Sequence, residues 1–200
     1  MRRRRIGIFG GTFDPVHVGH LIMAAEAVVR LRLDEMRFMP ARRPAHKRSR
    51  GLAPVEDRIA MLRLAIRGAP RFRVSRLEAD AREVTFTVRT LDALTRAEHG
   101  DYYFLMGQDS LEEFASWREP ERILSLARLV VVPRGEGVVP VLPAQVRRRV
   151  VFLKPPRIGV SSTEIRRRIR RGLPVRYWMP EAAWRYVARH GLYGYRSRRG

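Results

Sequence analysis

Short apolar runs alternate with amphipathic segments along most of this 200-residue chain. Residues 20–31 and 87–98 repeat apolar side chains at helical spacing, and so does a segment that starts at Pro54. Strands that alternate with helices of this length predict an α/β fold, in which one doubly wound parallel sheet carries helices on both faces. The runs that we expect to be strands are "RIGIFG", "EMRFMP", "RFRVSRLEA", "DYYFLM", "ARLVVVP" and "RVVFL".

Length and residue content set further limits. Two hundred residues fit one domain, and we expect residues 1–193 to form it, followed by a basic tail over residues 194–200. No cysteine occurs, which excludes disulfides, thiolate zinc sites and a nucleophilic thiol. The apolar run behind "MRRRR" ends after Phe9, which is too short for a secretory signal, and no segment is long enough to span a membrane. We therefore expect a cytoplasmic location.

The positive charge of the chain is unusually high. There are 41 lysines and arginines against 20 acidic residues, which gives a formal net charge of +21. Arginines at helical spacing on polar faces are typical of a solvated surface. A surface that meets polyanions is the other interpretation, and the charge alone does not decide between the two.

The stretch 7–20, "GIFGGTFDPVHVGH", joins the first predicted strand to the first predicted helix. In a parallel α/β sheet, ligands bind beyond the carboxyl ends of the strands, near this turn. Gly10 and Gly11 let the backbone approach a bound phosphate, and the helix that follows adds its positive end. The sequence contains neither G-x-G-x-x-G nor a P-loop, which disfavours hydride-transfer enzymes and P-loop kinases.

His17 and His20 are three residues apart in the first turn of that helix, so their side chains share one face. Two imidazoles at a helix N-terminus can both donate to one oxyanion, and we interpret them as a clamp for a phosphoryl group. A metal would need a third ligand, and although Asp14 is nearby, no H-E-x-x-H pattern occurs, so no metal ligand is predicted. A structural pair, capping or buried, is the other interpretation.

Two motifs far apart in the chain resemble those of a known superfamily. "GGTFDPVHVGH" resembles the H-x-G-H signature of the nucleotidyltransferases, and "GVSSTEIRRRI" resembles their Ser-Ser-Thr-x-x-Arg motif at a helix N-terminus. Further stretches are similar to the bacterial nicotinate mononucleotide adenylyltransferases: "RPAHK", "TFTVRTL", "FLMGQDSLEEFASW" and "YWMPEAAWRYVARHGLY". The resemblance covers nearly the whole chain and implies a Rossmann-like fold, with residues 1–193 as the nucleotidyltransferase domain.

The resemblance also implies a reaction. ATP and nicotinate mononucleotide would give nicotinate adenine dinucleotide and pyrophosphate in NAD biosynthesis, with Mg²⁺ bound mainly through the ATP phosphates. The attacking phosphate is already ionised at neutral pH, so alignment and charge stabilisation suffice and no general base is required. Neither a membrane nor a nucleic acid is expected as a partner, and a homodimer is left open.

Roles for individual residues follow from the same resemblance. His17 and His20 would hold the α-phosphate of ATP as negative charge builds on it. The triphosphate and the leaving pyrophosphate would be neutralised by His46, Lys47 and Arg166. Trp117 would stack on the pyridine ring, with Thr87 and the backbone around Trp117 and Arg118 reading its carboxylate. The other contacts to ATP are assigned to Gly10, Gly11, Thr12, Phe13, Gly107, Asp109, Ser161, Ser162 and Thr163.

Other interpretations remain open on the sequence alone. A related adenylyltransferase would use nicotinamide mononucleotide or phosphopantetheine as the acceptor. A noncatalytic nucleotide-binding protein would bind ATP without turnover. A nucleic-acid-binding protein would lose its affinity as salt is added, although the sequence contains no recognised nucleic-acid module.

Overall fold

The computed structural model describes residues 2–42, 51–81, 83–133, 142–156 and 158–196. Within these residues, six parallel strands form one sheet in the order β3-β2-β1-β4-β5-β6. The strands are β1 (Arg4–Gly11), β2 (Glu35–Pro40), β3 (Phe72–Val74), β4 (Gly100–Gly107), β5 (Ala127–Val132) and β6 (Val150–Phe152). The strand order reverses direction between β1 and β4, so the predicted doubly wound sheet is confirmed.

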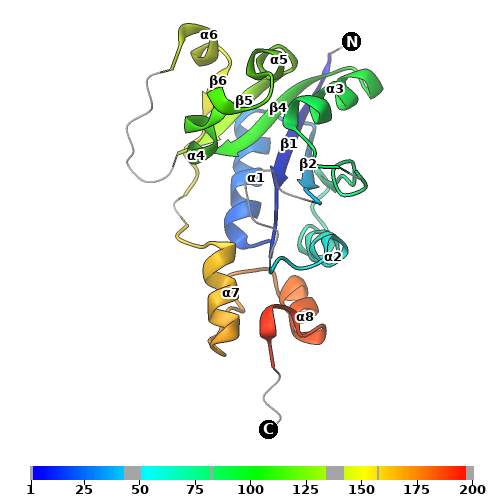
Figure 1. Ribbon diagram of the computed structural model, residues 1–200, viewed down its shortest axis with the longest axis vertical. Coiled ribbons are helices and arrows are strands. Elements are labelled where there is room, and N and C mark those ends of the chain that lie inside the picture. The colour runs from blue at the N-terminus through cyan, green and yellow to red at the C-terminus, as the bar shows by residue number, and fades with distance from the viewer. Residues whose placement is uncertain (1, 43–50, 82, 134–141, 157, 197–200) are drawn as a thin grey trace.

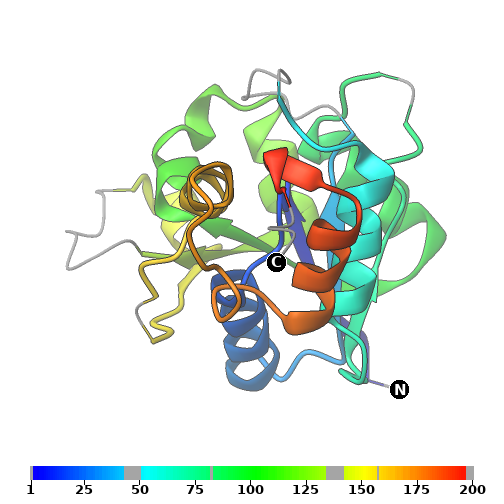
Figure 2. The same ribbon diagram turned by 90° about the horizontal axis from the view of Figure 1, so that it is seen from below.

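Helices cover both faces of the sheet (Figures 1 and 2). One core contains side chains from α1 (Val18–Arg30), α2 (Val55–Ala65), α7 (Ser162–Arg170) and α8 (Glu181–Arg189). The opposite core contains side chains from α3 (Thr87–Ala97), α4 (Gln108–Glu112) and α5 (Pro120–Leu126). The described residues also form α6 (Ala144–Arg147) and two single-turn helices, η1 (Phe114–Ser116) and η2 (Leu192–Gly194).

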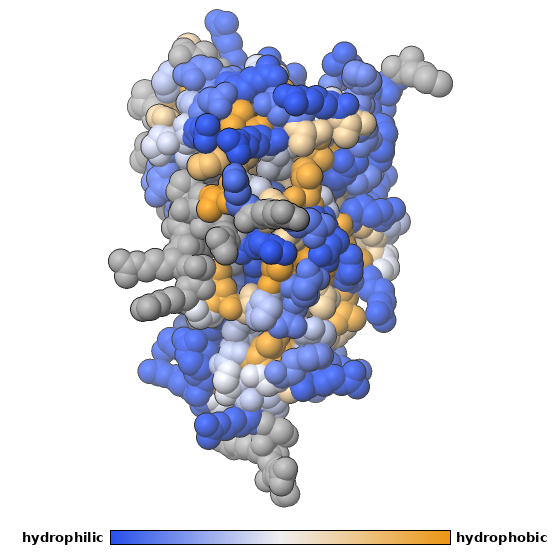
Figure 3. Space-filling view, turned by 45° about the vertical axis from the view of Figure 1, so that its right-hand side comes forward, coloured by the Kyte–Doolittle hydropathy of each residue, from blue (hydrophilic) through white to orange (hydrophobic). Residues whose placement is uncertain are grey.

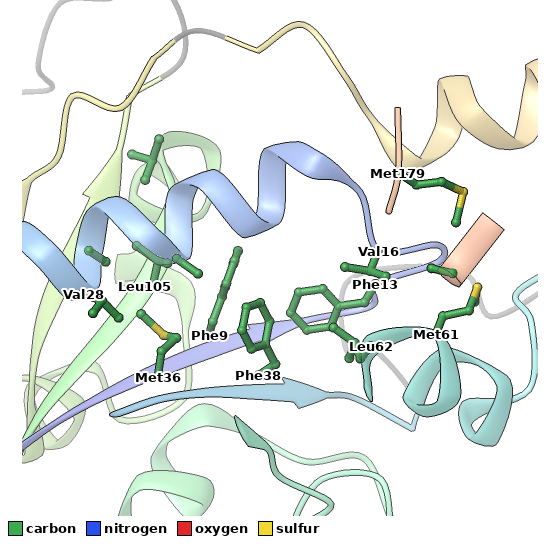
Figure 4. Close-up of a cluster of buried hydrophobic side chains, with 14 of the residues drawn as sticks. Phe9, Phe13, Val16, Val28, Met36, Phe38, Met61, Leu62, Leu105 and Met179 are labelled. Atoms are coloured by element: carbon green, nitrogen blue, oxygen red, sulfur yellow. The ribbon is translucent and has the colours of Figure 1, made fainter. Parts of the chain in front are cut away.

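The two cores are separate because side chains alternate along each strand. In β1, Ile6 and Ile8 pack into the core with α3 and α5, whereas Phe9 packs into the core with α1. The rings of Phe9, Phe13 and Phe38 lie side by side there, as Figure 4 shows, with centroids 5.3–5.8 Å apart. Strands buried on both faces are apolar throughout, which explains the continuous apolar runs in the sequence.

The predicted elements differ from the observed ones mainly at the sheet edge. The predicted strand "RFRVSRLEA" is wrong in its length, because only residues 72–74 pair with β2. Ser75 still donates its N–H to the carbonyl of Phe38 at 2.9 Å, and then the chain leaves the sheet. β3 is an edge strand with a neighbour on one side only, so neither burial nor pairing extends it.

Some of the arginine excess has a structural role at the amino ends of the strands. Arg37 bridges Glu35 at 2.6 Å and Glu98 at 2.5 Å, and Arg4 pairs with the same two carboxylates. Elsewhere, hydrophilic residues cover most of the face in Figure 3, with smaller apolar areas between them. None of the helices within the described ranges is long and apolar enough to cross a membrane.

Candidate active site

A cleft of about 750 Å³ opens at the carboxyl ends of β1, β4 and β5. This is the edge toward which the β1 and β2 arrows point in Figure 1. The cleft is lined by the loop after β1, the start of α1, the ends of β4 and β5, and the segment that leads into α7. Its apolar lining residues include Ile22, Met23, Met106, Val132, Pro133, Pro155, Ile158 and Val160.

His17 and His20 both line this cleft at the start of α1. Their rings are stacked, with centroids 3.7 Å apart and an interplanar angle of 29°. The backbone N–H of His17, the N-cap residue, donates to Nδ1 of His20 at 3.2 Å. Because Nδ1 of His20 accepts this bond, the tautomer that fits this geometry is the one with its proton on Nε2.

The His17 ring is neutral at physiological pH. His17 is 6% exposed, and burial lowers the pKa of its imidazole from 6.5 to about 4. Nδ1 of His17 is buried and has no hydrogen-bond partner among the described residues. This atom lacks the partner that buried polar atoms normally have, although the residue itself lines the cleft.

Gly19 allows the His17 ring to fold over the helix. A Cβ at position 19 would lie 3.1 Å from both Cε1 and Nδ1 of that imidazole, which is tighter than ordinary contact. A side chain at this position would therefore force the His17 ring to shift by a few tenths of an ångström.

Phe13 anchors the glycine turn from the protein interior. Its backbone φ is 50°, in the left-handed region that residues other than glycine seldom adopt. Its ring packs edge-on against Phe9 at 5.3 Å and against His20 at 5.0 Å, and the residue is 2% exposed. Burial of this ring holds the strained turn. The turn residues Gly10, Gly11, Thr12 and Phe13 all line the cleft.

The start of α7 is joined to the loop that precedes the histidines. Oγ of Ser161 caps α7 by accepting the N–H of Glu164 at 3.2 Å. Oγ of Ser162 donates to the carbonyl of Pro15 at 2.9 Å, across 147 positions of sequence. The structure thus brings the two sequence motifs together, and Ser161, Ser162, Thr163 and Arg166 all line the same cleft as the histidines.

Arg166 and Asp14 meet in the wall of the cleft. Nη1 of Arg166 donates to the backbone carbonyl of Asp14 at 2.6 Å, and Nη2 donates to Oγ1 of Thr163 at 3.4 Å. The Asp14 carboxylate is 1% exposed, and its Oδ1 accepts from the hydroxyl of Tyr193 at 2.6 Å and from the N–H of Ala53 at 3.2 Å. On the sequence alone, Asp14 was weighed only as a metal ligand, and its contact with Tyr193 was not predicted.

Arg58 supports the same loop from the buried side. This residue of α2 is 1% exposed, and its Nη1 donates to the carbonyls of Thr12 at 2.7 Å and Ala41 at 2.9 Å. Burial lowers the pKa of Arg58, and the negative charge of Asp14 opposes that shift. Arg58 was not predicted from the sequence, although an arginine among the apolar positions of a helix is a signal for such a buried role.

None of the three residues predicted to bind the pyridine nucleotide, Thr87, Trp117 and Arg118, is among the residues that line the cleft. The guanidinium of Arg118 lies 5.1 Å from the centroid of the Phe86 ring, and Phe86 is the residue before Thr87, where α3 begins. The indole of Trp117 lies 6.0 Å from the Phe104 ring in an edge-on arrangement. A Cβ on Gly10 would lie 3.5 Å from the Phe104 ring, which shows that this ring packs against the glycine turn.

The remaining predicted site residues differ in where they lie relative to the cleft. Gly107 ends β4 and lines the cleft, and a Cβ there would meet nothing within 4 Å. Asp109 is an exposed residue in the first turn of α4. His46 and Lys47 fall outside the described residues.

A cleft built by a histidine pair after the first strand and by the start of α7, where the two sequence motifs meet, defines a class, the nucleotidyltransferases of Rossmann-like fold. The family model described as cytidylyltransferase-like matches residues 8–168. A protein of Thermus thermophilus named probable nicotinate-nucleotide adenylyltransferase is 43% identical over 195 residues, which are 94% of this chain and 99% of that protein. One of Roseiflexus sp. with the same name is 42% identical, covering 94% of this chain and 97% of that protein. The chain belongs to the nicotinate-nucleotide adenylyltransferase family.

Solved structures support the fold. The Plasmodium falciparum nicotinic acid mononucleotide adenylyltransferase complexed with NaAD has a TM-score of 0.77 at 18% identity, covering 96% of this chain and 98% of that chain. The same protein complexed with APC has a TM-score of 0.78 at 19% identity and the same coverage. At this identity, the likeness establishes the shared architecture.

Proposed function

We propose that this chain transfers the adenylyl group of ATP to nicotinate mononucleotide. A phosphate oxygen of the mononucleotide attacks the α-phosphorus of ATP and forms a new P–O bond. The bond from the α-phosphorus to the oxygen that bridges it to the β-phosphorus breaks, and pyrophosphate leaves with the electron pair. The observation that carries this proposal is the convergence of His17, His20 and Arg166 on one cleft. The names of the relatives favour the same reaction.

The geometry supports one orientation of ATP. The backbone of residues 10–13 and the start of α1 suit phosphates, and the apolar lining suits the adenine ring. Arg166 is then the cation for the β- and γ-phosphates, with His46 and Lys47 assigned beside it from the sequence. Gly107 and Asp109 are assigned to the ribose side, and Ser161, Ser162 and Thr163 to the phosphate side.

Stabilisation of negative charge is the catalytic effect that we assign to this site. His17 is neutral near pH 7, so it acts as a hydrogen-bond donor or acceptor and leaves the positive charge to Arg166. Pre-oriented donors of this kind stabilise charge that develops on the α-phosphate in the transition state. We assign Mg²⁺ to the ATP phosphates, whose hard oxygen atoms it prefers, and the described residues contain no group of three or more metal-ligating side chains.

The acceptor would lie between the glycine turn and the start of α3. Trp117 offers an aromatic surface for the pyridine ring. We assign Arg118, whose guanidinium lies 5.1 Å from the Phe86 ring centroid and 3.7 Å from a carboxylate oxygen of Glu119, to an acidic acceptor in preference to an amide. This arrangement supports the nicotinate form of the acceptor.

An acceptor panel tests the proposal. Pyrophosphate release is measured with ATP, Mg²⁺ and one of nicotinate mononucleotide, nicotinamide mononucleotide or phosphopantetheine. We expect kcat/KM for the nicotinate compound to exceed the others by about tenfold or more. A higher value for another acceptor would reassign the substrate. ATP binding without turnover of any acceptor would favour the noncatalytic alternative.

A further inference from the structure

Tyr193 contacts the wall of the cleft from behind. It lies in η2, is not among the residues that line the cleft, and has its backbone in the left-handed region at φ 60°. Burial, together with the negative charge of Asp14, raises the pKa of the Tyr193 phenol. The phenol therefore keeps its proton at neutral pH and remains a donor to Oδ1 of Asp14.

The two oxygens of the Asp14 carboxylate have different surroundings. Oδ1 accepts two hydrogen bonds, from Tyr193 and from the backbone of Ala53. Oδ2 is buried, has no hydrogen-bond partner among the described residues, and lies 3.8 Å from Nη1 of Arg166. A direct contact between a carboxylate and a guanidinium is about 2.8 Å long, so a small movement of Asp14 would close this gap.

Such a closure would compete with the ligand for Arg166. In the present arrangement, Nη1 of Arg166 is bound to a neutral backbone carbonyl, and its side chain is 21% exposed in the cleft lining. Arg166 and Asp14 already form an ion pair at 3.8 Å, and a direct hydrogen-bonded contact would neutralise more of the guanidinium charge and lower its affinity for phosphate. The bonds that hold Oδ1 oppose this movement.

We propose that Tyr193 is a positioning residue for Arg166. By holding Oδ1 of Asp14, its hydroxyl keeps the carboxylate from closing on the guanidinium, whose charge is thereby kept for the outer phosphates of ATP. This inference rests on the proposed function only in taking ATP as the ligand, and it does not depend on the acceptor.

Binding measurements on Tyr193→Phe test the inference. Isothermal titration calorimetry with MgATP and no acceptor should give a dissociation constant about tenfold higher than that of the unmodified protein, the size expected for one hydrogen bond to a charged group. AMP lacks the outer phosphates, so its dissociation constant should change by less than about twofold. Equal weakening of ATP and AMP would indicate general damage to the cleft and would overturn the proposal.

Tyr186→Phe is the matched control. The hydroxyl of Tyr186, in α8, donates to a carboxylate oxygen of Asp57 at 2.8 Å, the same type of bond at a site outside the cleft lining. This variant should bind MgATP and AMP like the unmodified protein. Weakening of MgATP binding by Tyr186→Phe as large as that by Tyr193→Phe would also overturn the proposal.

A double-mutant cycle with Arg166→Ala tests whether Tyr193 affects MgATP binding through Arg166. In that background the guanidinium is absent, so adding Tyr193→Phe should change MgATP binding by less than about twofold. A further tenfold loss would show that Tyr193 acts through another group.

Asp14→Asn provides a second variant if Tyr193→Phe does not fold. It keeps an acceptor for Tyr193 and the backbone carbonyl for Arg166 but removes the competing charge. MgATP should then bind as tightly as to the unmodified protein, or more tightly, and weakening by about tenfold would refute the proposal. If the unmodified protein binds MgATP but does not use nicotinate mononucleotide, only the proposed function fails. If it turns over and Tyr193→Phe binds MgATP normally, only this inference fails.

Discussion

The imidazole of His17 is stacked on that of His20 at 3.7 Å, and the His17 backbone N–H donates to the His20 ring. One residue of the pair therefore fixes the tautomer of the other while its own ring stays neutral through burial. The pair lies at the start of α1 and lines the cleft, and the phosphate clamp stays a prediction that the kinetics of the histidine variants test.

Replacing either histidine should lower turnover more than binding. His17→Ala and His20→Ala each remove a group placed to stabilise transition-state charge, so we expect kcat to fall about 10²- to 10³-fold with a much smaller change in the KM for ATP. Steady-state kinetics with nicotinate mononucleotide provide the measurement. His190→Ala, at the exposed end of α8, is the control. Full kcat in both cleft variants would disprove the clamp.

The pKa of His17 predicts a loss of stability in acid. As pH falls from 6.5 to about 4, the unfolded chain protonates this imidazole and the folded chain does not. The free energy of unfolding should therefore decrease over that window, by about 3 kcal/mol from this residue. Urea unfolding should show a steeper acid loss for the unmodified protein than for His17→Asn. Parallel pH profiles for the two proteins would contradict the buried neutral state.

Gly19→Ala should separate stability from activity. Alanine favours a helix over glycine by about 1 kcal/mol, but its methyl group would push the His17 ring away. We expect a melting temperature close to that of the unmodified protein and a kcat at least about tenfold lower. Normal kcat in this variant would show that the ring position is not critical.

Loss of Arg58 should destabilise the whole fold. Arg58→Met leaves the carbonyls of Thr12 and Ala41 without a buried donor, so we expect the free energy of unfolding to drop by about 3–5 kcal/mol. Arg63→Met, at an exposed position of the same helix, should change it by less than about 0.5 kcal/mol. Equal effects of the two substitutions in denaturant unfolding would count against a supporting role for Arg58.

Trp117→Ala should affect only the acceptor side. Removing the indole deletes the proposed stacking surface, so the KM for nicotinate mononucleotide should rise about tenfold while the KM for ATP stays within about twofold. Trp184→Ala, in α8, should leave both constants unchanged apart from any loss of folded protein. If Trp117→Ala raised only the KM for ATP, the indole would contact ATP and not the acceptor, and the assignment would be wrong.

The central strands and the motif residues could be predicted because their signals are local. The bounds of β2 match the run "EMRFMP", since a strand buried on both faces has an unbroken apolar sequence. The turn at Gly10 and the N-cap at Ser161 also depend on neighbouring residues. Short edge elements such as β3 and α6 carry little apolar pattern, so their extents were not predictable.

The buried contacts that hold the loop after β1 had no local signal in the sequence. The contact between Asp14 and Tyr193 joins residues 179 positions apart, and Arg58 reaches the loop at Thr12 across 46 positions. Each pair depends on how separate segments meet in space, and periodicity along the chain carries no information about that. A buried aspartate and a buried arginine became informative only when their partners were visible.

The contact between Asp14 and Tyr193 sets an order of events during synthesis. The loop that follows β1 leaves the ribosome early, whereas its phenolic partner emerges only after every strand of the described sheet has been translated. A nascent chain therefore cannot form this hydrogen bond until residue 193 has been synthesised and folds back onto the loop.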